Sequence, residues 1–90
     1  MFVTMSPGRI VGTKQLEISS GKSAVVGREG LSSRISCKTE GLIITEAAKK
    51  DKTKGYILSP GEVLCFSDCI NVYNGGSQNA TLSVIETDTI

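Results

Sequence analysis

Two of the three cysteines, Cys65 and Cys69, stand four positions apart in the segment CFSDC, a spacing compatible with a metal site, a redox pair or a disulfide. A structural zinc site needs four ligands. The chain has no histidine, and Cys37 is its one further cysteine. The pattern of residues on either side of CFSDC is therefore needed to distinguish a metal site, a redox pair and a disulfide.

Apolar residues flank Ser67-Asp68 on both sides, which predicts a hairpin with these two residues at its tip. Opposed residues of a hairpin share a face, and successive residues alternate faces. This register places Cys65 beside Ile70 on the more apolar face and points Cys69 the other way, so the two thiols are poorly placed to bridge. We favour packing roles for the cysteines over a disulfide, and a disulfide over a metal site.

Gly21-Lys22-Ser23 matches the end of a P-loop, in which backbone amides surround a nucleotide phosphate. The full motif requires a glycine five positions before Gly21, where this chain has Leu16. The residues after Ser23 show no helical pattern, so no helix N-terminus is expected to hold a phosphate. We predict a hairpin turn at this position.

Four lysines gather around Asp51: Lys49, Lys50, Lys52 and Lys54. Such a cluster can contact phosphates or an acidic protein surface. It lacks interleaved aromatic residues, and the chain has a net charge of only +1, unlike most nucleic-acid-binding domains. We interpret the segment as a solvated loop, retain it as a candidate protein-docking site and expect no nucleic-acid partner.

The absence of histidine excludes the Ser-His and Cys-His pairs of nucleophilic catalysis. Acidic pairs such as Glu46 with Asp51 and Glu62 with Asp68 have hydrophilic neighbours, which do not favour the raised pKa that acid catalysis needs. We therefore predict a protein that is not an enzyme, with no catalytic residues, no cofactor and no bound metal.

The elements that would position these side chains are strands, because apolar and polar residues alternate along most of the chain. About eight short runs show this pattern: 14–19, 23–27, 34–38, 42–45, 55–58, 62–66, 70–73 and 79–86. Glycine and proline turns separate them. The sequence predicts an all-β fold, a small antiparallel β-sandwich or barrel formed as a single domain by residues 13–90. Residues 1–12 are predicted to be an N-terminal arm or an edge strand.

The chain is 90 residues long and 39% apolar, which allows one domain with a modest core. This small core favours a homo-oligomer, in which a second copy covers further apolar surface. No apolar stretch approaches the roughly 18 residues of a membrane-spanning helix, and the N-terminus lacks a signal-peptide pattern. The odd number of cysteines argues against a disulfide framework. We expect no membrane association and synthesis in a reducing, intracellular compartment.

Gly27-Arg28 followed by Ser33-Arg34 resembles the phosphothreonine pocket of forkhead-associated domains. That family has a Gly-Arg pair after one strand and a Ser-Arg-x-His segment further on. Here only four residues separate the two pairs, and Ser36 occupies the histidine position. The resemblance implies a peptide-binding module as an alternative function, while solvent-facing strand ends are the favoured interpretation of the two arginines.

A Pro60-Gly61-Glu62 turn, an Ile-Asn-Val-Tyr strand at 70–73 and a last alternating strand ending at Glu86 follow one another within residues 55–87. This order resembles a module common in structural proteins of tailed phages. The first half departs from it, because Glu40-Gly41-Leu42-Ile43-Ile44 stands where an Asn-x-Gly turn and a Val-Tyr-Val run would be expected. The resemblance implies an auxiliary capsid protein of the decoration or cement kind, with a tail, neck or fibre-base component as the alternative.

By this resemblance the protein would be made in the host cytoplasm, join the virion and bind the major capsid protein or another virion protein, adding interface area to the shell. The predicted docking residues are apolar side chains near the N-terminus and the lysines of the solvated loop: Phe2, Val3, Met5, Ile10, Val11, Lys49, Lys50, Lys52 and Lys54.

Overall fold

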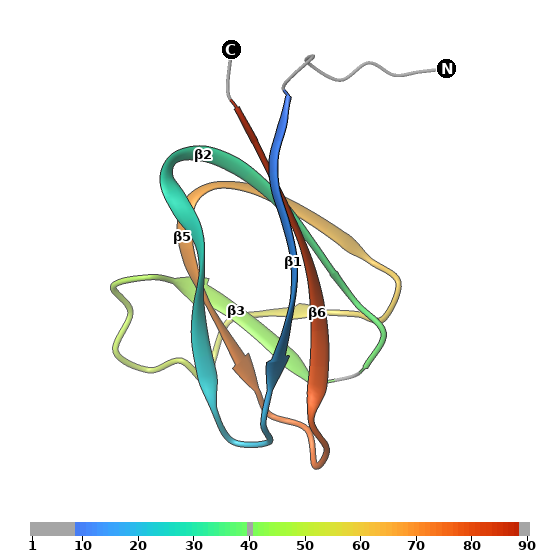
Figure 1. Ribbon diagram of the computed structural model, residues 1–90. Helices are drawn as coiled ribbons and strands as arrows, with labels where there is room; N and C mark the ends of the chain where they lie inside the picture. Colours follow the sequence, from blue (N-terminus) through green and yellow to red (C-terminus); the bar gives the residue numbers. More distant parts are fainter. Residues whose placement is uncertain (1–8, 40, 89–90) are drawn as a thin grey trace.

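A computed structural model of the protein describes residues 9–39 and 41–88. Six strands form one antiparallel sheet in the order β1-β6-β2-β5-β3-β4 (Figure 1). Their bounds are β1 Ile10–Ile18, β2 Ser23–Cys37, β3 Leu42–Glu46, β4 Tyr56–Leu58, β5 Val63–Asn74 and β6 Ala80–Asp88. The predicted all-β antiparallel fold is confirmed. The described strands number six rather than about eight, because two pairs of predicted strands are each continuous.

The first difference from the sequence prediction concerns the paired strands β2 and β5. Each was predicted as two short strands, but each continues through a bend that the two strands share. Arg28 lies opposite Asp68 and Ser32 lies opposite Ser67, so the register shifts here while pairing continues on both sides. Asp68 has a φ of 63°, in the left-handed region that aspartate tolerates better than most residues. Its Oδ1 accepts a hydrogen bond from the Gly30 amide at 2.9 Å. The predicted hairpin tip is therefore wrong: it is a bend inside one long strand.

The bend also overturns the predicted placement of Cys65, whereas Cys69 points away from Ile70 as predicted. The side chains of β5 that pack on the core are Leu64, Phe66, Ile70 and Val72. Cys65 and Cys69 alternate with these residues and both face outward. Cys65 is exposed opposite Arg34, and the half-buried Cys69 thiol donates to the Gly27 carbonyl at 3.6 Å. The predicted burial of Cys65 beside Ile70 is wrong, whereas Cys37 is a buried packing residue.

A second difference concerns the turn at residues 19–22. The Lys22 amide donates to the Ser19 carbonyl at 3.0 Å, and Gly21 has a φ of 76°. This is a tight turn, as predicted, but it does not close a hairpin, because β6 lies between β1 and β2 in the sheet. The chain therefore crosses the end of β6 as it passes from β1 to β2.

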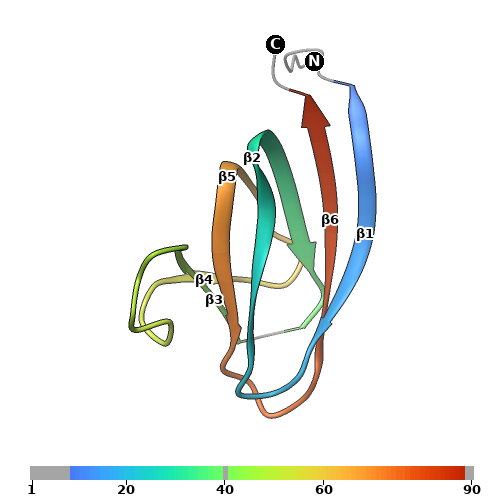
Figure 2. The same cartoon turned by 60° about the vertical axis from the view of Figure 1, so that its left-hand side comes forward.

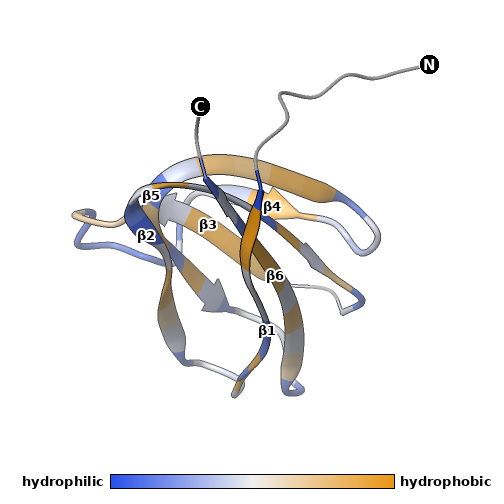
Figure 3. Ribbon diagram, turned by 45° about the horizontal axis from the view of Figure 1, so that its top comes forward, coloured by the Kyte–Doolittle hydropathy of each residue, from blue (hydrophilic) through white to orange (hydrophobic). Residues whose placement is uncertain are grey.

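The core lies inside the bent sheet, with β1 and β6 along one side and β3 and β4 on the other (Figure 2). Apolar and polar residues alternate along β6, as Figure 3 shows, and the inward set of that strand is almost inaccessible to solvent. Among the described residues, the core consists of one cysteine, Cys37, and ten aliphatic side chains: Ile18, Val26, Ile35, Leu42, Ile44, Leu58, Val72, Ala80, Leu82 and Val84. Burial of this set is the main stabilising contribution of a domain of this size.

Asn74 is the last residue of β5 and lies where the β1–β2, β2–β3 and β5–β6 connections meet. Its side chain is fully buried, and Nδ2 donates to the carbonyls of Ile18 at 2.9 Å and Gln78 at 2.7 Å. Its Oδ1 accepts from the Gly76 amide at 2.9 Å. Its backbone also exchanges hydrogen bonds with the turn at 19–22. One side chain thus connects the end of β1 to the β5–β6 turn.

Candidate docking surfaces

The four predicted lysines lie on the loop of residues 47–55, which joins β3 to β4. Lys49, Lys50 and Lys54 are exposed, and Lys52 is half-buried. Asn71 on β5 holds the beginning of this loop. Its amide is buried and donates to the carbonyls of Glu46 at 2.9 Å and Ala47 at 3.0 Å. The loop therefore starts from a fixed point on the outer face of the sheet.

Asp51 organises the tip of the lysine loop. Its carboxylate accepts hydrogen bonds from the hydroxyl and the amide of Thr53, and these two bonds, in that order, hold the pKa of Asp51 below its ordinary value. The ion pairs of the described residues involve Arg9 with Asp88 and Arg28 with Glu86. The lysines around Asp51 are thus available to an acidic partner.

The far end of the loop is also constrained. A Cβ at Gly55 would come within 2.2 Å of the Ile44 carbonyl oxygen, so only glycine fits there. The Tyr56 hydroxyl donates to Glu62, which also accepts from the Ser59 amide at 2.9 Å. The hydrogen bond from Tyr56 lowers the pKa of Glu62 and raises the pKa of Tyr56. Both ends of the lysine loop are therefore attached to the sheet.

Three apolar side chains form a row across β5, β3 and β4, because Tyr73 lies opposite Ile43 and Ile43 lies opposite Ile57. Their neighbours along the strands are in the core: Leu42, Ile44, Leu58 and Val72. Alternation therefore places this apolar row on the outer face of the sheet. Ile57 is 64% exposed, and Val25, 62% exposed, extends the apolar surface onto β2. The lysine loop adjoins the row, since it follows β3 and precedes β4.

Sequence reasoning missed the apolar row. The signal was present in Leu42-Ile43-Ile44, where three consecutive apolar residues on one strand put apolar groups on both faces. The partners of Ile43 could not be foreseen, because they lie on strands distant in sequence.

Of the predicted N-terminal docking residues, only Ile10 and Val11 belong to the described part of the chain. Phe2, Val3 and Met5 fall outside the described residues. Ile10 and Val11 begin β1 and are 63% and 48% exposed, next to an irregularity in the pairing with β6. They lie on the edge strand opposite β4 in the strand order, so the sheet does not bring them together with the lysine loop.

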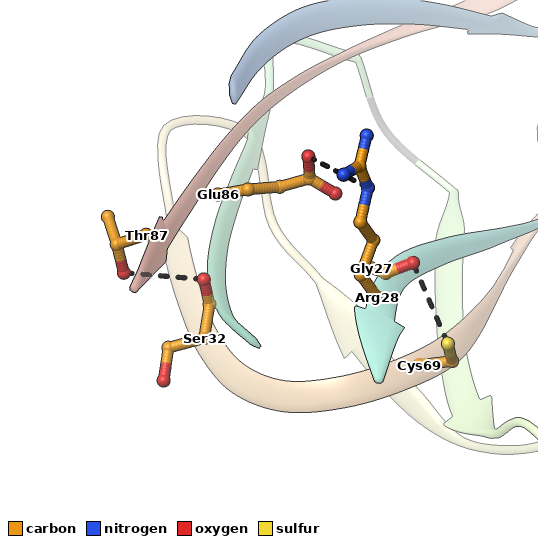
Figure 4. Close-up of polar contacts among 6 residues, drawn as sticks. All are labelled: Gly27, Arg28, Ser32, Cys69, Glu86 and Thr87. Atoms are coloured by element: carbon orange, nitrogen blue, oxygen red, sulfur yellow. Dashed lines mark hydrogen bonds and ion pairs between the residues drawn. The ribbon is translucent and has the colours of Figure 1, made fainter. Parts of the chain in front are cut away.

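A buried carboxylate lies at the opposite end of the sheet from Asn74. Arg28 Nε is 3.6 Å from Glu86 Oε1, and the two side chains are 69% and 4% exposed (Figure 4). Gly12 makes room for this carboxylate, since a Cβ there would lie 2.8 Å from Oε1. Ser33 lies opposite Glu86 and is buried, so its hydroxyl is not presented to a phosphopeptide. Of the residues that resemble the forkhead-associated motif, Ser33 belongs to the interior of this end, whereas Arg28 and Arg34 face solvent, as predicted.

No known protein family matches the chain, and no curated protein matches it. Among solved structures, a de novo designed double-stranded β-helix, determined by solution NMR, is similar with a TM-score of 0.67, over 84% of this chain and 99% of that chain. The two sequences are 16% identical, so the likeness concerns the fold alone. Across residues 9–39 and 41–88, no helix is long and apolar enough to cross a membrane.

Proposed function

We propose that the protein is a non-enzymatic structural module that docks on a protein assembly through the apolar row and the adjoining lysine loop. The observation that carries the proposal is the position of this row, on an exposed sheet face next to a loop attached at both ends. Following the resemblance to tailed-phage modules, the assembly is the virion, and the partner is the major capsid protein. The protein would then serve as a decoration or cement protein.

The chemistry of the surface supports an acidic protein partner. Protein interfaces combine an apolar centre with a polar rim, and exposed aliphatic and tyrosine side chains suit the centre. The lysines supply a positively charged rim, which fits an acidic surface and accelerates encounter with it. Because the loop is already held by Asn71 and Gly55, little chain entropy is lost when it binds. The proposed occupant is therefore an acidic capsid surface with an apolar centre.

The experiment compares Ile57→Ser with Val63→Ser in the full chain. Val63 is a matched control, since it is 60% exposed but lies opposite Ser36, away from the apolar row. Each protein is sedimented with capsids of the phage that encodes it, prepared without the protein. An isoleucine side chain that becomes buried on docking contributes roughly 1.5–3 kcal/mol to the binding free energy, so its loss weakens binding by about tenfold or more.

We expect Ile57→Ser to bind at least about tenfold more weakly than the parent chain, with Val63→Ser unchanged. If the parent chain does not sediment with capsids, the capsid partner is wrong. If both variants bind like the parent chain, the apolar row is not the docking surface. Analytical ultracentrifugation of the free protein tests the predicted homo-oligomer separately.

A further inference from the structure

A cavity of about 320 Å³ lies on the other side of the molecule, against β1, β6 and the end of β2. It is lined by Gln15, Ser36, Cys37, Lys38, Thr39, Thr81 and Ser83. This volume is at the lower end of the range of small-molecule sites, about 300–1,000 Å³. The cavity differs from most such sites because nearly every described side chain in its lining is polar and none of these is aromatic.

The sheet register arranges these side chains in rows. Gln15 and Ser36 lie on either side of Ser83, directly opposite it on the two neighbouring strands. Thr81 lies on the same face of β6 as Ser83. The antiparallel ladder therefore holds Gln15, Ser83 and Ser36 at the spacing of adjacent strands, about 5 Å apart, with Thr81 about 7 Å from Ser83 along β6.

These polar groups are not used by the protein itself. No hydrogen bond to another protein group was found for the side chains of Gln15, Ser36, Thr81 and Ser83 among the described residues. The Thr39 hydroxyl is buried and lacks a partner in the same part of the chain. Buried polar atoms without partners are uncommon in folded proteins, so the Thr39 hydroxyl needs a partner from outside the protein, either water or a bound group.

A second cavity of about 480 Å³ adjoins the first, since Thr39 lines both. Its other lining residues are Gly41, Gly76, Ser77 and Gln78. Hydroxyl and amide groups therefore continue from one cavity to the next. Lys38 supplies the one charge among the described lining residues.

We propose that these cavities bind a polyhydroxylated ligand bearing a carboxylate, of the uronic-acid type found in acidic polysaccharides. Hydroxyl and amide side chains both donate and accept, which matches the hydroxyls of a sugar ring. The Lys38 ammonium favours a negatively charged substituent. The polar lining disfavours an apolar ligand, and the absence of aromatic walls disfavours a nucleobase, which stacks. This site is separate from the docking surface of β5, β3 and β4.

The test uses the full chain and three probes, sodium D-glucuronate, D-glucose and sodium phosphate, in NMR titrations of the backbone amides. We expect saturable shifts at Gln15, Lys38 and Ser83 with glucuronate, and weaker binding of glucose. Thr81→Val should bind glucuronate at least about fivefold more weakly, as loss of one hydrogen bond of about 1 kcal/mol predicts. Thr13→Val is the matched control on the same face but outside the cavity, and should bind like the parent chain.

Lys38→Gln should remove the preference for glucuronate over glucose while leaving the amide spectrum otherwise unchanged, which shows that the variant is folded. An equal response to phosphate and glucuronate would overturn the sugar assignment and indicate a simple anion site. The absence of saturable shifts with all three probes up to about 20 mM would overturn the site itself, since that concentration detects binding at millimolar Kd.

Discussion

Replacing Asn74 with alanine should lower the free energy of unfolding more than any substitution of an exposed polar residue. The side chain is 0% exposed and makes three hydrogen bonds, with the carbonyls of Ile18 and Gln78 and with the Gly76 amide. Alanine removes all three at once. The Ile18 carbonyl then remains in a buried position without its donor, whereas water can reach the other two partners more easily.

The magnitude follows from these three bonds. Each part-buried hydrogen bond contributes about 0.5–1.5 kcal/mol, and leaving a buried carbonyl unsatisfied costs about 1–3 kcal/mol. The two part-buried bonds and the unsatisfied carbonyl together predict a loss of about 2–6 kcal/mol for Asn74→Ala, with a central value of about 4 kcal/mol. In a domain of this size, 1 kcal/mol corresponds to about 4–8 °C, so the central value lowers the melting temperature by about 16–32 °C.

The assay is urea unfolding followed by far-UV circular dichroism, together with thermal unfolding of the same samples. Asn79→Ala is the matched control, because Asn79 is exposed in the same β5–β6 connection. It should stay within about 0.5 kcal/mol of the parent chain. A loss below about 1 kcal/mol for Asn74→Ala, or an equal loss for both variants, would refute the assignment of Asn74 as the side chain that holds this end together.

Three further outcomes are expected. Among the cysteines, Cys65 should be alkylated first by iodoacetamide, as peptide mass spectrometry would show, since it is exposed; slower labelling of Cys65 than of the buried cysteine would contradict the strand register. The pH titration of the Thr53 amide signal should have a midpoint below 3.8, the ordinary pKa of aspartate, because the folded state lowers the pKa of Asp51. The stabilising contribution of Asp51 is therefore present above pH 3.8 and is lost as the pH falls through the lowered pKa. A midpoint at or above 3.8 would contradict the two hydrogen bonds from Thr53. Arg28→Ala should lower the free energy of unfolding, measured with urea, by about 1–2 kcal/mol in the parent chain and by under about 0.5 kcal/mol in the Glu86→Gln background. Equal losses in the two backgrounds would mean that the ion pair between Arg28 and Glu86 contributes nothing to stability.

Local patterning predicted the strand content of this protein well. Alternation along residues 79–86 corresponds to β6, and the run 14–19 overlaps β1. The same alternation also carries information that was not used. Glu86 continues the every-second-residue series of Ala80, Leu82 and Val84, so its carboxylate lies on the buried face of β6. A charged residue in an inward position was therefore readable as a buried group that requires a partner.

The bends of β2 and β5 could not be predicted from local patterning, because a turn signal within a strand resembles a turn signal between strands. Ser67-Asp68 would suit a hairpin tip, and Asp68 does adopt a positive φ. The choice between tip and bend depends on whether residues on both sides find partners on another strand. Here β2 pairs with both halves of β5, so the ladder continues through the turn residues.

By itself, the sequence determined the all-β class, the positions of most turns and the solvated lysine loop, since these depend on side-chain alternation and on the φ preferences of single residues. Only the tertiary structure decided the strand order, the outward direction of Cys65, the apolar row of Ile43, Ile57 and Tyr73, and the burial of Asn74. Each of these depends on pairing between segments far apart in the chain, and local preferences carry no information about which distant strand supplies the partner.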